Sequence, residues 1–431
     1  MEPGKFINPY LTRSDLLVLR SLLRDIENES KADGEVQLKP DCGCEDADDD
    51  DGATIRHLSN LNRPEHDDFE PTIFLSWDTN ELKKLHPTLT RYLIQPYLHH
   101  AQKLVRVETD VVFLTHLLLY FTTSLPSAAL LYHHFTWPHA LVHWLMQSYY
   151  VGTYTLMMHQ HIHMGGILSR RLWYIDTLFP YILDPLMGHT WNSYYYHHVK
   201  HHHVEGNGPG DLSSTLRYQR DSVFDFMCYV ARFFFLVWLE LPLYFVRRRK
   251  YGMAVRAGAW ELADYMFIYL LYRFVNVRAT VFVLVLPLVL LRVGLMVGNW
   301  GQHALVDEVD PTSDFRSSIT LIDLASNRFC FNDGYHTSHH LSPRRHWRQH
   351  PVAFMVKKYR YINEGALVFR NIDYLMMTVE LLQKDYMYLA KCMVPMGKKQ
   401  IGMSLEERAK MLRRKTRRFG EDEIWNLYLK K

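Results

Sequence analysis

The chain has 431 residues, of which 48% are apolar and 14% aromatic. A formal net charge of +3 without a strongly basic domain gives no support for nucleic-acid binding, and five scattered cysteines are too few for a disulfide framework. The mean hydropathy of −0.19 is low for a protein made mainly of membrane-spanning helices, so much of the chain is expected outside any membrane. Histidine stands out, with 25 residues.

The first 70 residues are predicted to be an amphipathic helix followed by an acidic disordered region. Residues 12–26 place five leucines on one stripe, which is typical of a short helix with one buried face. Residues 28–68 are polar and acidic, a composition that favours disorder. No signal peptide is expected, because residues 1–8 lack a basic start followed by an apolar run.

Two apolar runs, 111–132 and 138–158, are each long enough to cross a bilayer and are separated by a few residues. They predict a helical hairpin. A second pair, 262–275 and 280–297, is less uniform because its first run carries Asp264 and Arg273. The expected fold is therefore an all-α integral membrane protein. It has four transmembrane helices in two hairpins, interfacial helices and a cytosolic histidine-rich cap domain.

The segment 226–246 is also long enough to span, but it carries Arg232 and Glu240 and ends in the basic run 247–250. Counting it as a span would place the histidine clusters of the two halves on opposite sides. As an interfacial helix it leaves four crossings, with the clusters and the basic run on one side, which the positive-inside rule makes cytosolic. We adopt four crossings, partly because this choice keeps the clusters together.

Four groups of histidines lie at the ends of these runs or beyond them. Their spacings, either i, i+4 or H-x-x-H-H, place imidazoles on one face of a helix. The proposed metal ligands are His159, His163, His198, His201, His202, His303, His336, His339 and His340. Nine nitrogens are too many for one metal and suit two metals with open positions. Imidazole suits iron, whereas zinc seldom needs so many ligands and is not redox-active. Two irons can activate dioxygen against an unactivated C–H bond, and a membrane location points to an acyl chain.

The order of these groups resembles the membrane fatty acid desaturase superfamily. The resemblance implies two iron ions held by an HxxxH box, matched by His159 and His163, and by two HxxHH boxes that begin at His198 and His336. Asn299 and His303 resemble the Asn-x-x-x-His element of acyl-CoA desaturases, in which the histidine is a ligand and the asparagine holds a metal-bound water. The resemblance covers residues 75–365; residues 1–70 and the helical, basic C-terminal tail, 366–431, lie outside it.

Extra histidines leave the register of the boxes open. We interpret His161, His197 and His203 as supporting or spare residues, although His197 and His201 are also four apart. Asp333, three residues before the last box, is the preferred candidate for a carboxylate that hydrogen-bonds a ligand imidazole. In the tail, a separate basic helix beginning near Lys398 is expected either to meet anionic lipid or to be solvated.

The expected function is desaturation of a lipid acyl chain by two irons and O2. A hydroxylase or other oxygenase on the same scaffold is the alternative within the enzyme class, and a histidine-rich metal transporter is the alternative outside it. No haem-binding or flavin-binding segment is visible, so electrons are expected from a separate donor such as cytochrome b5 and its reductase. The resemblance further implies the endoplasmic reticulum membrane, with the histidine boxes facing the cytosol.

Overall fold

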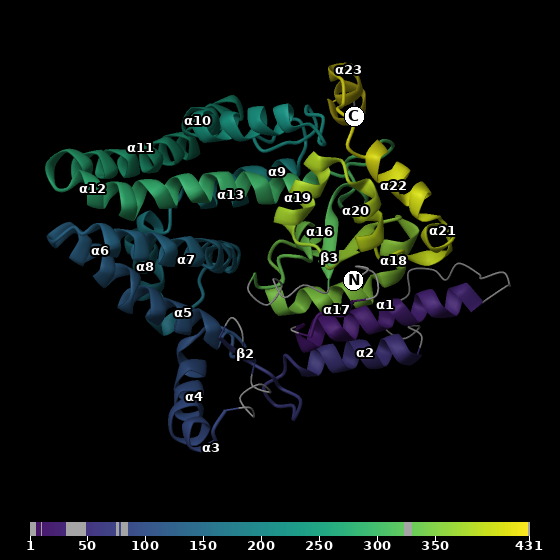
Figure 1. Cartoon of the computed structure of the whole chain (residues 1–431), viewed down its shortest axis with the longest axis horizontal. Coiled ribbons are helices and arrows are strands. Elements are labelled where there is room, and N and C mark those ends of the chain that lie inside the picture. Colours follow the sequence, from purple (N-terminus) through teal and green to yellow (C-terminus); the bar gives the residue numbers. More distant parts are fainter. Residues whose placement is uncertain are drawn as a thin grey trace. The chain divides into compact units, whose positions relative to one another are not determined.

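The structure is a computed structural model that describes residues 6–9, 11–31, 49–74, 77–78, 85–322 and 330–429. These residues are mostly helical and form two compact units (Figure 1). Unit 1 comprises Met1–Asp68, Glu205–Val230 and Met296–Lys431, and unit 2 comprises Phe69–Val204 and Ala231–Leu295. Helices α10 (Val223–Arg247) and α13 (Leu286–His303) each contribute to both units. The all-α expectation needs one correction, because each unit also contains a short two-stranded sheet among its described residues.

Unit 2 is built from helices joined by short turns, visible in blue and teal in Figure 1. The apolar stretch from Val111 to His133 divides at Thr123 into α5 and α6. Pro126 lies in the first turn of α6, where it cannot donate a hydrogen bond to the preceding turn, so the helix restarts there. The elements of this unit outside the two shared helices are β1 (Thr72–Phe74), β2 (Trp77–Asp78), α3 (Pro87–Leu89), η2 (Thr90–Ile94), α4 (Gln95–Leu104), α5 (Val111–Thr122), α6 (Ser124–His133), α7 (Trp137–Met164), η3 (Arg170–Leu172), α8 (Trp173–Leu186), η4 (Tyr195–His202), α11 (Tyr251–Phe274), α12 (Val277–Thr280) and η5 (Val281–Val285).

Among the described residues, three helical segments are long and apolar enough to cross a membrane: Val111–His133, Val223–Arg247 and Val277–His303. The first and third contain spans expected from the sequence. The second, expected to be interfacial, qualifies by length and composition, and its Arg232 and Glu240 form an ion pair at 3.2 Å. Helices α7 and α11 are not among them: polar residues and histidines interrupt α7, and charged residues interrupt α11. The count of four crossings is therefore not confirmed.

Unit 1 has its own apolar core, in which α1 (Arg13–Lys31) packs with residues from the second half of the chain. Strand β3 (Ile319–Ile322) pairs in parallel with β4 (Leu367–Arg370), and all four residues of each strand are buried. The hydroxyl of Tyr335 donates to Asp15 at 2.8 Å, which ties α1 to the segment before the last histidine box. The other elements are α2 (Asp49–Asn60), α9 (His203–Glu205), α14 (Asp314–Ser317), α16 (His336–Leu341), η6 (Trp347–Gln349), α17 (His350–Val356), α18 (Lys358–Asn363), α19 (Tyr374–Gln383), α20 (Tyr386–Cys392), α21 (Gly397–Ile401), α22 (Leu405–Arg414), α23 (Glu421–Ile424) and η7 (Trp425–Leu429), α9 starting at the end of unit 2.

The predicted disorder of residues 28–68 is wrong for residues 28–31, which form the end of α1, and for residues 49–68. Helix α2 occupies Asp49–Asn60 and lies beside α1 (Figure 1). Asp51 is buried, accepts a hydrogen bond from Ser21 and forms an ion pair with Lys358. A carboxylate that composition marks as solvated is thus held by a buried cation. Residues 32–48 lie outside the described residues.

The basic tail is part of unit 1 and is not a separate helix. Ser404 and Glu407 form the expected capping box at the start of α22. Two of the cations that follow are paired, Lys415 with Asp307 at 2.7 Å and Arg417 with Glu423 at 2.9 Å, whereas Arg413 and Arg414 are exposed. For Lys415 and Arg417, ion pairs within the unit therefore take the place of the expected lipid or solvent partners.

Candidate metal centre

The first pair of histidines ends helix α7. His159 and His163 are four residues apart, and their ring centroids lie 4.7 Å apart at an interplanar angle of 83°. The helix ends directly after them, because Gly165 adopts the left-handed conformation (φ 66°) that favours glycine. This pair is arranged as the spacing predicts.

The second group lies on a π-helix, η4, which changes which residues share a face. In a π-helix the backbone bonds run from i to i+5, and the N–H of His203 accordingly donates to the carbonyl of His198. The two imidazoles therefore meet, with Nε2 atoms 3.0 Å apart and ring centroids 4.5 Å apart. His202 lies beside them, its ring stacked at 5.5 Å from that of His198.

Together these residues form the unit 2 histidine set, defined as His159, His163, His198 and His203. One ring nitrogen from each lies within 4.8 Å of the others. His203 was interpreted as supporting or spare, and its membership in this set is a finding that the α-helical register missed. An i, i+5 spacing was the only sequence signal that pointed to it.

Three other histidines of this region point elsewhere. His201, an expected ligand, packs its ring edge-on against Tyr244 with centroids 4.4 Å apart. His197 packs against Phe233. His161 contacts Asp176, whose carboxylate lies 3.5 Å from its Nε2. His161 and His197, interpreted as supporting or spare, lie outside the unit 2 histidine set, and so do His201 and His202, which were expected ligands.

The unit 1 histidine set, defined as His303, His336 and His340, forms where α13 ends and α16 begins. The Nε2 atoms of His303 and His336 lie 3.0 Å apart. The ring of His340 lies 4.9 Å from that of His303 and 4.5 Å from that of His336. His339 lies one turn after His336 in α16, with its ring 6.2 Å from that of His336 and 6.1 Å from that of His340.

Hydrogen bonds hold the residues around His303 in place. The amide of Asn299 donates to the carbonyl of Ser213 at 2.9 Å and to the hydroxyl of Tyr229 at 2.7 Å. These bonds use the amide hydrogens, so the amide oxygen is the atom that suits a metal-bound water. The hydroxyl of Thr215 donates to the carbonyl of His303 at 2.7 Å.

Carboxylates near the last box differ from the expectation. Asp333 accepts a hydrogen bond from Gln302 at 3.0 Å, and burial raises its pKa to about 7. The carboxylate that lies near an expected ligand is Asp314, 3.5 Å from Nδ1 of His340. Asp314 can therefore orient that imidazole, the role that had been assigned to Asp333.

The donor chemistry of both sets fits a redox metal. Burial and four neighbouring imidazoles hold the pKa of His198 well below its usual value, which favours the neutral form that binds metal. Two nitrogens bonded at about 2.0–2.1 Å and at right angles to one metal stand about 3.0 Å apart. Each set contains one nitrogen pair at this distance. An all-imidazole donor set suits iron.

A comparison with protein-family models matches residues 135–363, just over half of the chain, to the fatty acid desaturase family. The matched segment contains every histidine of the unit 1 and unit 2 sets. Neither the curated proteins nor the solved structures contain a match to this chain.

Proposed function

Because this chain belongs to the fatty acid desaturase family, we propose that it desaturates a lipid acyl chain with two irons, O2 and electrons from a separate donor. The observation that carries the proposal is the pair of histidine sets inside the matched segment, each with two ring nitrogens at the spacing of neighbouring metal ligands. We include His202 and His339 as ligands, because each lies in a box beside these sets.

The residues of the chain have distinct tasks in this reaction. Iron, when bound, supplies the activation of O2 and the removal of hydrogen from unreactive C–H bonds. The buried imidazoles would hold it through neutral nitrogens, and the amide oxygen of Asn299 would be available beside it as a hydrogen-bond acceptor. Overall the acyl chain loses two hydrogens and the donor supplies two electrons. With two protons from solvent, dioxygen is reduced to two waters.

The electron source and location follow from the same family. Two electrons per turnover come from a small b-type cytochrome, cytochrome b5, and its reductase. The three apolar helices make an integral membrane location the natural one. We place the protein in the endoplasmic reticulum membrane with its histidines facing the cytosol, where that donor is found.

The test is lipid profiling of cells that express the wild type or His339→Ala, with His100→Ala as a matched control. His100 is exposed on α4 and belongs to neither set. Wild type and His100→Ala are expected to produce a lipid lighter by two hydrogens, and His339→Ala is expected to produce none.

The mass of the product also separates the alternatives. A gain of one oxygen would replace desaturation by hydroxylation. Purified protein that carries stoichiometric zinc, or no iron, would contradict both reactions and support metal transport instead.

A further inference from the structure

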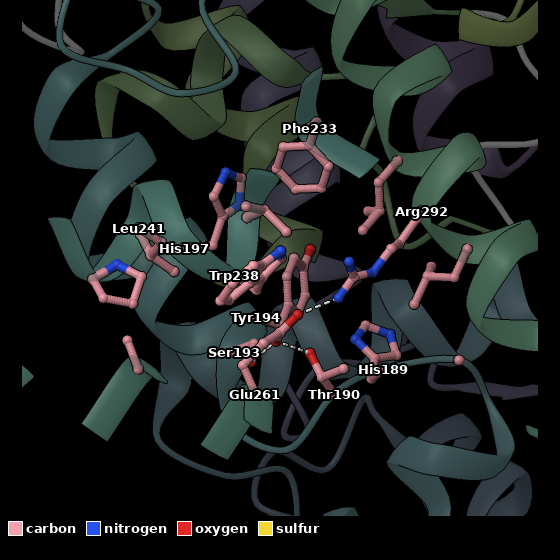
Figure 2. Close-up of a pocket in the computed structure, with 16 residues that line it drawn as sticks. His189, Thr190, Ser193, Tyr194, His197, Phe233, Trp238, Leu241, Glu261 and Arg292 are labelled. Carbon is pink, nitrogen blue, oxygen red and sulfur yellow. Dashed lines mark hydrogen bonds and ion pairs between the residues drawn. The ribbon is translucent and has the colours of Figure 1, made fainter. Parts of the chain in front are cut away.

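A buried carboxylate lies beside the segment that leads into the second histidine box. Glu261 of α11 is 4% exposed. One of its carboxylate oxygens accepts hydrogen bonds from the hydroxyls of Thr190 and Ser193, and the other accepts one from the hydroxyl of Tyr265. Arg292 of α13 forms an ion pair with the same carboxylate (Figure 2). Both oxygens of Glu261 are therefore held by the protein.

Thr190 and Ser193 are the two ends of a turn. The N–H of Ser193 donates to the carbonyl of Thr190 at 3.2 Å. Asn192, between them, adopts a left-handed conformation (φ 55°), which asparagine tolerates better than most residues. Because the hydroxyls at both ends of the turn donate to the same oxygen of Glu261, this one carboxylate holds the whole turn.

The turn continues directly into the π-helix η4. The N–H of Tyr196, in the first turn of η4, donates to the carbonyl of Asn192 at 3.3 Å. A π-helix is rare and is found mostly at functional sites, so its conformation needs support from outside the helix. A start that is fixed in space supplies such support.

The ion pair holds the carboxylate independently of η4. Besides Glu261, Arg292 contacts α10, where it donates to the carbonyl of Phe234 at 3.3 Å. The carboxylate is thus fixed by contacts among α10, α11 and α13. A buried ion pair contributes little net stability compared with apolar residues of similar volume, and its best-attested use is to fix a register.

We propose that Glu261 is a positioning residue for the unit 2 histidine set. Through Thr190 and Ser193 it anchors the start of η4, and the π-helical register that follows brings His203 beside His198. The inference rests on the proposed function only in taking this set as an iron site.

The experiment measures iron content by mass spectrometry after the purified full chain is equilibrated with buffered ferrous iron. The test variant is Thr190→Val with Ser193→Ala, which removes both hydroxyls and keeps Glu261 paired with Arg292. The matched control is Tyr265→Phe, which removes a hydroxyl from the other oxygen of the same carboxylate and does not alter the turn. The rescue variant is Thr190→Ser with Ser193→Thr, which keeps both hydroxyls.

The test variant is expected to bind the iron of the unit 2 set about 10-fold to 100-fold more weakly, the range for loss of a residue that orients a ligand. The control and the rescue variant keep the anchor and are expected to stay within about threefold of the wild type. The iron of the unit 1 set is expected to bind unchanged in all of them, which shows that the chain remains folded. Adding His203→Ala to the test variant is expected to give the affinity of His203→Ala alone within about threefold, because both changes remove the same ligand.

The inference is overturned if the test variant binds iron as the wild type does, or if Tyr265→Phe weakens binding as strongly as the test variant. It is also overturned if the effect of His203→Ala adds in full to that of the test variant, as a merely loosened fold would predict. Ser193→Ala alone, which removes a single hydroxyl, carries the same test if the double variant does not fold.

The two proposals fail separately. A wild type that takes up iron, overlaid by the test variant, contradicts only the positioning role of Glu261. A wild type that takes up no iron contradicts the proposed function and the positioning role together.

Discussion

Replacing His203 by alanine is expected to weaken metal binding at the unit 2 histidine set at least about 100-fold, whereas replacing His201 is not. The two residues are separated by one position, and the H-x-x-H-H pattern selects His201. The π-helical turn selects His203, because its i to i+5 geometry carries that side chain back to His198. The pair of substitutions therefore tests whether the π-helix sets the ligand register.

The size of the effect follows from the nitrogen positions. Nε2 of His203 lies 3.0 Å from Nε2 of His198, the separation of two neighbouring ligands on one metal. An N–H···N hydrogen bond between the two imidazoles has the same length, so the metal content must distinguish ligation of a metal from such a hydrogen bond. Loss of a residue that merely supports a ligand weakens metal binding about 10-fold to 100-fold. Loss of a ligand from a set of four is therefore expected to cost at least about 100-fold.

The assay is iron content by mass spectrometry after the purified chain is equilibrated with buffered ferrous iron. Half-saturation is expected to move by two or more decades for His203→Ala and to stay within about threefold of wild type for His201→Ala. His201→Ala also controls for the loss of an imidazole from the same turn. The reasoning fails if the His203→Ala curve overlays the wild-type curve, or if His201→Ala moves as far.

Three further predictions concern stability. Asp51→Ala removes the carboxylate closest to Lys358, which is 2% exposed, and is expected to lower the free energy of unfolding by about 3 kcal/mol. The control Asp50→Ala changes a side chain that is 70% exposed and is expected to alter the free energy of unfolding by less than about 0.5 kcal/mol. Equal effects of the two substitutions in thermal unfolding would contradict this prediction. Burial lowers the pKa of His189 to about 3. Below pH 6.5, this imidazole therefore binds a proton in the unfolded state but not in the folded state. Stability should therefore fall from pH 6.5 toward pH 3 by up to about 1.4 kcal/mol per pH unit, and thermal scans of His189→Gln should show a shallower slope than wild type. Ser404→Ala removes the capping box of α22 and is expected to cost about 1 kcal/mol, seen as faster hydrogen exchange confined to that helix.

Several features were predictable because they depend on near neighbours in the chain. The i, i+4 pair on α7, the capping box of α22 and the amphipathic α1 each require only a local helix and a known spacing. The apolar runs within Val111–His133 and Val277–His303 were also predictable, since length and hydropathy suffice to recognise a candidate membrane span.

Other features depend on which distant residues meet. Composition marked residues 28–68 as solvated, yet Asp51 is buried because Lys358, some 300 positions away in the chain, supplies its partner. Lys415 and Arg417 of the tail similarly form ion pairs with carboxylates, and the spacing of residues along the chain does not predict these pairs.

The amino-acid sequence by itself determined that this protein carries histidine boxes typical of a membrane di-iron enzyme, because the type and approximate spacing of the ligands are properties of short sequence segments. Only the tertiary structure decided which histidines converge. A π-helical turn adds about one residue per turn, and it brings His203 rather than His201 beside His198. No propensity of the individual amino acids predicts such a turn.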